Sequence, residues 1–402
     1  MEVWNTGKLN SLFILKNDKA KQIKSSEYLE NGQYPVVDQS IDFICGYYEK
    51  HEKVNCKDLP LTVFGDHTRH VKYVDFPFVA GADGTQLLKP TSLLTDKYLY
   101  YLVLFASSRI ANHGYDRHLK HLREFEVSFP DSKEEQSTIA TILTTIDQAI
   151  EKTERLIAKY ERIKTGLMQD LLSRGIDEQG RIRSEETHAF KDSALGRIPV
   201  EWEVLPIIEI TKKDSPICYG IVQVGKNTDN GIPTIAIKDM RGDFRQGVHL
   251  TSKEIEANYK RSRLMPGDLL ISIKATIGKV AIVPDWFYGN VSRDLARIRL
   301  VDSCIPEYYK HYFTSTLGQK SLMDITVGTT RKEVSIAPLR KLEVIVPKKE
   351  EQERIAKFLN TPEKALLELT SKKEKLESLK RGLMQDLLTG RVRVDGVNQL
   401  SF

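Results

Sequence analysis

Hydrophobic residues recur along two stretches of the chain with the spacing of helices that bury one face. In each stretch the selected positions step by 4, 3, 4, 3 and 4 residues, which averages close to the 3.5-residue repeat of a coiled-coil seam. These positions are Ala149, Thr153, Leu156, Tyr160, Ile163 and Leu167 in the first stretch, and Ala365, Leu369, Lys372, Leu376, Leu379 and Leu383 in the second. The pattern predicts two long helices with a packed seam, interrupted in the second by a lysine.

The two stretches belong to a duplicated unit. Residues 134–173 match residues 350–389 at a constant offset of 216 without a gap, and 18 of the 40 positions are identical, against roughly 3 expected by chance from average composition. The run GLMQDLL is unbroken in both copies. We expect a short helix followed by a long one in each copy, the long one beginning near Thr145 and near Thr361. Thr361 suits an N-cap and Pro362 the first helical position, where proline would break one continuous helix.

Each copy carries a glycine inside its long helix, Gly166 and Gly382. A glycine there costs about 1 kcal/mol relative to alanine, so its repetition indicates close backbone approach by another helix. Packing of the two helices as an internal hairpin and docking of a partner are both open, and they are compatible. The residues predicted to dock a partner are Gly166, Leu167, Met168, Leu171, Gly382, Leu383, Met384 and Leu387.

Two globular segments alternate with the helices and share their beginnings and ends. Trp4 opens the first and Trp202 the second. Each closes with a largely buried helix, a turn ending in arginine, and a strand that finishes on a proline before the letters E-E-Q. The turns are 114–117 and 328–331. Between these shared ends the globules differ in sequence, as expected if each recognises something different.

The chain is therefore predicted to be an α+β protein built as a pseudo-twofold tandem repeat. Two mixed α/β globular domains would be separated by two long antiparallel coiled-coil helices. The expected divisions are residues 1–133 and 196–349 for the two recognition domains, 134–175 and 350–390 for the helical spacers, 176–195 for a polar, glycine-bearing linker, and 391–402 for a C-terminal tail.

Turns between the predicted strands carry side chains that suit DNA. Arginine and lysine bind guanine edges and phosphates, asparagine binds adenine, and serine and threonine position phosphates. The candidate DNA-binding residues are His67, Thr68, Arg69, Lys72, Arg117, Lys226, Asn227, Lys238, Arg241, Lys274, Thr276, Lys279, Ser292, Arg293, Arg331 and Lys332. The competing interpretation of any single lysine is a solvated surface charge. The pair Asp66–His67 also leaves open a metal ligand or an acid–base pair, although no second spaced cluster accompanies it.

Composition narrows the class of protein only a little. The net charge of +5 and the isoelectric point near 8.7 are compatible with a nucleic-acid partner but do not require one. The four cysteines form no C-x-x-C pair, so we expect neither a zinc site nor a disulfide framework. The first residues, MEVWNTGKLN, contain no apolar signal core, and no stretch approaches the roughly 20 apolar residues of a membrane span. We expect a cytoplasmic protein.

Several motifs together resemble a known family. They are a tryptophan at the start of each globule, the strand-rich segment from Ser262 to Pro284 around PGDLLISI, the sequence NVSR at 290–293, the G-x-x-R turn, the E-E-Q helix start and the GLMQDLL helix end. This combination covers essentially the whole chain and resembles the specificity subunit of type I restriction–modification systems. The first globule departs from the pattern, with NGQYPVVDQS and FGDHTR in place of the PGDLL strand, so its DNA specificity should differ from that of the second.

The resemblance implies a DNA-binding subunit that is not itself an enzyme. Each globule would read half of a bipartite target, and the helices would act as a spacer. A helix of about 27 residues spans ~40 Å, close to the ~34–36 Å of one DNA turn. The implied partners are double-stranded DNA, two methyltransferase subunits, and restriction or translocase subunits. S-adenosylmethionine, ATP and magnesium would belong to those partners, which together form a restriction endonuclease and adenine-specific DNA methyltransferase complex.

Two alternative functions fit the sequence less well. A stand-alone methyltransferase or nuclease is disfavoured, since the chain has no [DNS]-P-P-[YF] tetrapeptide, no glycine-rich cofactor loop and no phosphate-binding G-x-x-x-x-G-K-[ST] motif. Pro130-Asp131 loosely resembles a nuclease motif, but the second copy has Pro347-Lys348. A coiled-coil scaffold without a DNA role explains the helices but not the two divergent globules.

Overall fold

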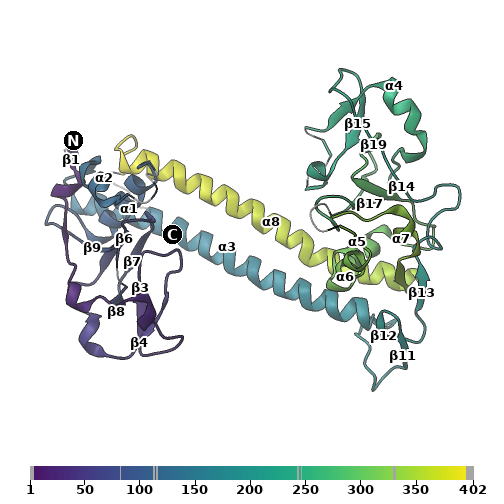
Figure 1. The fold of residues 1–402 in the computed structure, drawn as a ribbon. Helices are drawn as coiled ribbons and strands as arrows, with labels where there is room; N and C mark the ends of the chain where they lie inside the picture. The colour runs from purple at the N-terminus through teal and green to yellow at the C-terminus, as the bar shows by residue number, and fades with distance from the viewer. Residues whose placement is uncertain are drawn as a thin grey trace. The chain divides into compact units, whose positions relative to one another are not determined.

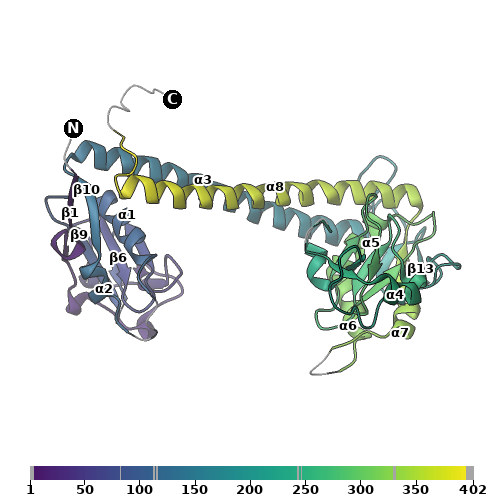
Figure 2. The same cartoon turned by 90° about the horizontal axis from the view of Figure 1, so that it is seen from above.

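The computed structural model describes residues 4–81, 83–111, 114, 116–241, 244–245, 247–328 and 332–394. The chain forms two compact units, Met1–Arg155 with Leu369–Phe402, and Leu156–Glu368. Each unit contains one globule, the beginning of one long helix and the end of the other. The long helices are α3, Lys133–Ser173, and α8, Lys349–Leu388. Figures 1 and 2 show that within each unit the two helices lie side by side.

Unit 1 holds two four-stranded sheets and a two-stranded ribbon. The first sheet has the order β2-β9-β6-β7, the second β4-β3-β8-β5, and the ribbon pairs β1 with β10. The bounds are β1 Trp4–Lys8, β2 Phe13–Leu15, β3 Tyr34–Val37, β4 Gly46–Tyr48, β5 Val54–Asn55, β6 Leu61–Gly65, β7 Val71–Val74, β8 Phe78–Ala80, β9 Thr85–Pro90, β10 Glu126–Pro130, α1 Asp96–Ser107 and α2 Leu119–Glu124. The buried face of α1 packs on the first sheet and on α3.

Unit 2 repeats this plan. Its sheets have the orders β14-β20-β17-β18 and β16-β15-β19, and its ribbons pair β13 with β21 and β11 with β12. The bounds are β11 Phe190–Ser193, β12 Gly196–Pro199, β13 Glu203–Pro206, β14 Cys218–Tyr219, β15 Ile232–Ile235, β16 His249–Thr251, β17 Leu269–Ser272, β18 Val280–Ile282, β19 Asn290–Val291, β20 Leu295–Ile298, β21 Glu343–Val346, α4 Lys253–Glu256, α5 Pro306–Thr314, α6 Thr316–Asp324 and α7 Ile336–Lys341.

The two globules share a topology although their sequences differ. In each, the second sheet contains one antiparallel hairpin and one parallel pair: β3 with β4 and β8 in unit 1, and β15 with β16 and β19 in unit 2. The strands of the first sheets also correspond in order, so the β6–β7 turn of unit 1 is equivalent to the β17–β18 turn of unit 2. The predicted tandem repeat of mixed α/β domains and long helices is confirmed.

The predicted division of each repeat into a short and a long helix is wrong. Both α3 and α8 are continuous, and Pro362 lies inside α8. A proline within a helix removes one backbone hydrogen bond and crowds the preceding turn. Pro362 has no N–H to donate to the carbonyl of Phe358, four residues earlier, yet its ring is buried within unit 2. Tertiary packing therefore outweighs the local signal for a helix start.

The predicted seam is present in part. Thr153 is buried and most of the other seam positions are half-buried, whereas Ile163, Leu379 and the interrupting Lys372 are exposed. The expected close approach at the repeated glycines is not observed among the described residues. A Cβ added at Gly166 or Gly382 would meet no atom within 4 Å. The glycines thus leave an open patch on the helix surface.

Equivalent ion pairs join the two helices within each unit. In unit 1 Lys380 of α8 binds Asp147 of α3 at 2.5 Å, and in unit 2 Lys164 of α3 lies 3.5 Å from Glu363 of α8. These four positions are related by the offset of 216 residues. Lys373 also binds Glu154 at 2.8 Å in unit 1. Since the residue numbers run in opposite directions along the two helices, the pairing is antiparallel, as predicted.

The repeated E-E-Q sequence locks each helix start to its globule through the glutamine. Gln136 accepts a hydrogen bond from the Thr95 amide (2.8 Å) and donates to the carbonyls of Leu93 and Pro130 (2.9 Å each). Gln352 repeats these contacts with the Ile305 amide (2.9 Å) and with the carbonyls of Ser303 (3.3 Å) and Pro347 (2.8 Å). Both glutamines are fully buried. Each ties the start of a long helix to the start of α1 or α5 and to the end of the last strand.

The second glutamate of E-E-Q binds the segment that follows the other long helix. Glu351 accepts hydrogen bonds from Arg183 and from the Trp202 indole, the latter at 3.0 Å. Glu135 binds Arg393 through contacts of 2.8 and 2.9 Å, and Arg393 lies over the Trp4 ring. Both glutamates are buried. In each case a bidentate guanidinium compensates the buried negative charge. We call these two groups the carboxylate clasps.

The segment expected to be a linker is ordered in unit 2. It contains Arg183 of the clasp, and β11 and β12 form a hairpin at 190–199. The helix before it ends at Ser173. Gly175, two residues later, has a positive φ of 68°, and its close neighbours Glu351 and Trp202 leave no room for a side chain. Packing against the clasp therefore orders a stretch that is polar and rich in turn residues.

Replacing Gln136 by leucine should destabilise unit 1 by about 3 kcal/mol, because one buried amide and two carbonyls lose their partner and each unpaired group costs about 1–3 kcal/mol. Gln148→Leu on the exposed face of the same helix is the matched control and should change the stability by less than about 0.5 kcal/mol. Chemical denaturation measures both. Equal effects of the two substitutions would contradict the lock.

Unit 2 should lose stability as the pH falls from 7.5 to 5.5. His311 is fully buried, and its Nε2 lies 2.8 Å from the Asn360 Oδ1 and 3.8 Å from Glu363. Burial, aided by Lys310 and Lys164, lowers the pKa of His311 against the opposing effects of Asn360 and Glu363. The folded unit therefore favours the neutral ring, whose contribution is present above the unfolded pKa of about 6.5 and lost below it.

The slope should approach about 1.4 kcal/mol per pH unit for one proton. Burial raises the pKa of Glu363, but Lys310 and Lys164 together hold it below its ordinary value, so this carboxylate titrates outside the window. His311→Gln retains a donor for Asn360 and should flatten the pH dependence. Denaturation of both proteins at a series of pH values measures the difference, and parallel curves would show that another group is responsible.

Candidate nucleic-acid interface

In unit 1 the loops with candidate residues are joined into one cluster. The Gln39 side chain accepts a hydrogen bond from the His67 amide (3.1 Å) and donates one to the Asp83 carbonyl (2.8 Å). The backbone carbonyl of Gln39 accepts a hydrogen bond from the Thr68 hydroxyl. The Arg69 guanidinium donates to the carbonyl of Ile110 at 2.6 Å. Loops 38–45, 65–70 and 83–84 therefore form the first loop cluster.

Asp66 serves this cluster structurally. Its carboxylate accepts the amide of Leu119 at 2.7 Å, its carbonyl accepts the amide of His118 at 2.8 Å, and its own amide donates to the Gly84 carbonyl. The carboxylate is buried. Among the described residues, no group of three or more His, Cys, Asp and Glu side chains could hold a metal ion. The Asp66–His67 pair is thus explained by backbone contacts.

Unit 2 forms an equivalent second loop cluster from residues 219–222, 273–279, 292–294 and 332–334. The Ala275 amide donates to the Lys332 carbonyl at 3.2 Å, and Lys274 binds Glu333 at 3.0 Å. The Arg293 amide donates to the Ile221 carbonyl at 2.9 Å. The structure thereby brings together Lys274, Arg293 and Lys332, which are 19 to 58 residues apart in the sequence.

Most candidates have the exposure that contact with DNA requires. Exposed side chains are Thr68, Arg117, Lys226, Asn227, Lys238, Thr276, Arg293 and Lys332, and half-buried ones are His67, Arg69, Lys274 and Lys279. Three of the exposed residues lie apart from the second loop cluster: Lys226, Asn227 and Lys238 belong to segments beside β16, where Asn227 accepts the Leu250 amide at 2.8 Å. Arg331 and the side chain of Arg241 lie outside the described residues.

Two candidates are buried and do not face the surface. Lys72 is 5% exposed, and its ammonium donates to the carbonyls of Asp38 (2.8 Å) and Asp42. Burial lowers the pKa of Lys72, while nearby Cys45 and Asp38 oppose this shift. Ser292 is also buried. The Lys72 side chain therefore holds the loop together instead of presenting its charge to DNA, and the buried Ser292 hydroxyl is not presented to DNA either.

The residues predicted to dock a partner mostly face their own unit. Leu171 is part of the core of unit 2, and Met384 and Leu387 are part of the core of unit 1. Leu167, Met168 and Leu383 pack against these cores, so only Gly166 and Gly382 remain exposed. Equivalent internal packing in the two units therefore explains the repeated GLMQDLL sequence. The sequence pattern predicted contact of these side chains with a partner.

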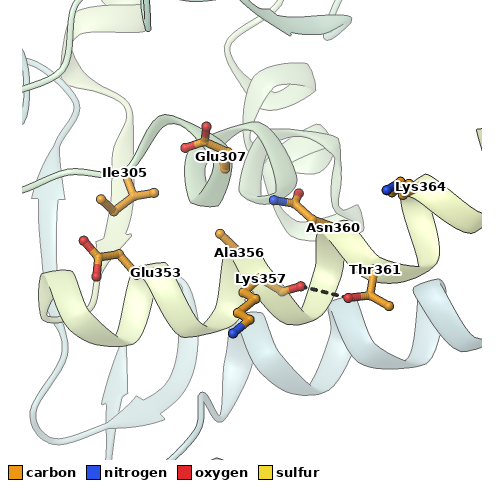
Figure 3. A pocket seen from close by; sticks show the side chains of 8 residues that line it. All are labelled: Ile305, Glu307, Glu353, Ala356, Lys357, Asn360, Thr361 and Lys364. Carbon is orange, nitrogen blue, oxygen red and sulfur yellow. Dashed lines mark hydrogen bonds between the residues drawn. The ribbon is translucent and has the colours of Figure 1, made fainter.

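A hollow of about 420 Å³ offers an open surface beside α8 in unit 2 (Figure 3). It is lined by Ile305, Glu307, Glu353, Ala356, Lys357, Asn360, Thr361 and Lys364. Two acidic side chains, Glu307 and Glu353, and two basic ones, Lys357 and Lys364, lie among these residues. The lining includes the exposed face of the helix next to the E-E-Q lock.

Sequence reasoning missed Gln39 and the two clasp arginines. Gln39 lies in the segment DQS, which carries no motif, so only the folded structure connects it to the turn at 65–70. Arg183 and Arg393 could have been suspected, since each follows a copy of GLMQDLL within a short basic run. The different spacing in the two copies, eleven residues after Leu172 and five after Leu388, obscured their equivalence.

Comparison with known proteins agrees with this architecture. The family model described as the type I restriction modification DNA specificity domain matches residues 1–162 and 199–380. The type I restriction enzyme MjaVIII specificity subunit of Methanocaldococcus jannaschii is 22% identical over 419 residues, covering 99% of this chain and 95% of its own length. The EcoBI specificity subunit of Escherichia coli is 28% identical over 231 residues, or 56% of this chain and 48% of that relative.

A solved structure shares the fold over nearly the whole length. The crystal structure of the type I restriction-modification system S subunit from M. genitalium matches with a TM-score of 0.65 and 16% identity, covering 96% of both chains.

No helix in the described part of the chain is long and apolar enough to cross a membrane. The four cysteines are free thiols.

Arg293 and Lys332 should contribute differently to DNA binding. Arg293→Ala should weaken binding about tenfold and relax sequence preference, whereas Lys332→Ala should weaken all sequences alike and reduce the salt dependence by about one counterion. Arg197→Ala is the control, because Arg197 is exposed but pairs with Glu185 and Asp192 on the β11–β12 hairpin. Fluorescence anisotropy at several salt concentrations measures these effects. An equal loss in the control would contradict the assignment.

Proposed function

Because the chain belongs to the family of type I restriction modification DNA specificity domains and is a specificity subunit of such a system, we propose that its two globules read the two halves of one bipartite DNA target. The observation that carries this proposal is one topology with different loop residues in the two units. A shared frame presents both loop clusters alike, while their side chains differ. Neither a DNA-independent scaffold nor a stand-alone enzyme is supported by the family match.

The long helices would set the separation of the half-sites. In α3, roughly 20 residues separate Asp147, which accepts a hydrogen bond from Tyr101 of the first globule, from Leu167, which packs on the second core. A helical run of that length covers ~30 Å at 1.5 Å per residue, comparable to the ~34–36 Å of one DNA turn. Two half-sites about one turn apart would then face the same side of the duplex.

The chemistry would belong to partner subunits. We propose that two methyltransferase subunits dock on equivalent helix surfaces, which include the open patches at Gly166 and Gly382 and, in unit 2, the hollow along α8. Restriction or translocase subunits would join them. S-adenosylmethionine, ATP and magnesium would bind to these partners, and the role of this chain would be to bind and position DNA without catalysis.

Selection of bound sequences from random duplex DNA tests the proposal, with the full chain and the methyltransferase subunit encoded beside it. The expected result is two fixed half-sites around a degenerate spacer of constant length. Insertion of seven residues in both α3 and α8, after Lys159 and after Lys375, keeps the seam in phase and adds ~10 Å. The spacer should then grow by about three base pairs.

A single contiguous motif would show that only one globule reads DNA and that the helices are not a ruler. A stable complex with the methyltransferase subunit that enriches no DNA sequence would instead support a coiled-coil scaffold without a DNA role. An insertion in α3 alone is the control: it puts the antiparallel ion pairs out of register and should reduce binding without defining a new spacer.

A further inference from the structure

Three large apolar side chains are exposed together in the loop between β3 and β4. Ile41 is 79% exposed, Phe43 45% and Ile44 41%. Phe43 contacts Phe76 with ring centroids 6.0 Å apart, so the loop and the segment after β7 form one apolar patch. Contiguous apolar surface of this kind commonly marks an interaction site.

The loop is held in one conformation by buried polar contacts. The Lys72 ammonium binds the carbonyls of Asp38 and Asp42 at both sides of Ile41. The Asp38 carboxylate accepts the Ser40 amide and the Cys45 thiol at 2.8 Å each. A loop fixed in this way presents its side chains without a large entropic cost on binding.

The patch belongs to the first loop cluster. Gln39, two residues before Ile41, binds the backbone of His67 and the side chain of Thr68 in the candidate DNA-binding turn. Within unit 1, β3, β4 and β8 lie on the side of the globule away from α3 and α8 (Figure 1). The apolar loop therefore adjoins the predicted DNA-binding surface and is remote from the helices.

In the equivalent loop of unit 2, between β15 and β16, the described residues have a different character. Lys238 and Arg245 are exposed there, Arg245 lies over the Trp286 ring with 4.7 Å to its centroid, and Phe244 is buried. A protein that docks in the same way on both units needs matching surfaces. Two globules that bind different half-sites need different surfaces, so the difference between the two loops favours DNA as the occupant.

We propose that the loop of Ile41, Phe43 and Ile44 recognises thymine methyl groups in the half-site read by the first globule. This inference rests on the proposed function. In the major groove the C5-methyl of thymine is the only apolar group on a base edge. Isoleucine and phenylalanine side chains have no hydrogen-bonding atoms, so the thymine methyl is the base-edge group that they match.

Replacement of thymine by deoxyuridine tests the proposal, because it removes only the methyl group. With the full chain in its methyltransferase complex, each thymine of the two selected half-sites is replaced in turn and the affinity is measured. At least one position in the first half-site should lose about fourfold, the value for one buried methyl group. Substitutions in this loop are not expected to change the effect of methyl removal in the second half-site.

Ile41→Ala and Phe43→Ala should weaken binding of the thymine duplex and abolish its advantage over the deoxyuridine duplex. Leu93→Ala is the matched control: Leu93 is similarly exposed in unit 1, but its carbonyl binds Gln136 on the helix side. It should keep the full methyl effect. Thermal melting of each variant verifies folding, which the high exposure of Ile41 should leave intact.

A first half-site without thymine, or an unchanged methyl effect in Ile41→Ala, would overturn the proposal while leaving the bipartite target intact. Loss of methyltransferase binding by Ile41→Ala, with the methyl effect retained, would instead identify the loop as a protein-docking surface. Absence of any bipartite motif with the wild-type chain would refute the proposed function and this inference together.

Discussion

Each globule is completed by the end of the helix that begins at the other globule, and the carboxylate clasps depend on this exchange. A buried glutamate without its arginine would leave an uncompensated charge, which costs several kcal/mol. Glu135 needs Arg393, and Glu351 needs Arg183. The leucines of the repeated GLMQDLL sequence add apolar contacts at the same two places. Neither repeat can satisfy its buried charge alone.

This arrangement separates the parts of the chain that hold the fold from those that are free to differ. The glutamine locks, clasps and interhelical ion pairs all use the duplicated segments together with the ends of the globules or the segments that follow the long helices. The loop clusters use contacts specific to each globule, such as Gln39 in unit 1 and the Lys274–Glu333 pair in unit 2. One frame can therefore present two unlike surfaces.

The repeat could be predicted from the sequence because it rests on 40 aligned positions and on helical periodicity. The continuity of α8 could not be predicted, because Pro362 locally favours a helix start, whereas tertiary packing buries it inside one continuous helix. Several candidates, such as Thr68 and Arg293, lie in loops as predicted, but Lys72 lies in β7 and Lys238 in a 3-10 helix. Residue type also did not distinguish a surface cation from Lys72, whose ammonium binds the carbonyls of Asp38 and Asp42. That distinction depends on Asp38 and Asp42, some 30 residues away, and on the paired strands that bring them close.

The order in which the chain is synthesised gives the exchange of helix ends a consequence for folding. The residues of the first globule and Glu135 leave the ribosome early, but Met384, Leu387 and Arg393, which complete their core and clasp, follow some 250 residues later. Unit 2 has all its partners by Glu368. The part made first is thus finished last, and until then its apolar seam stays open to chaperones or to the helix end of a neighbouring nascent chain.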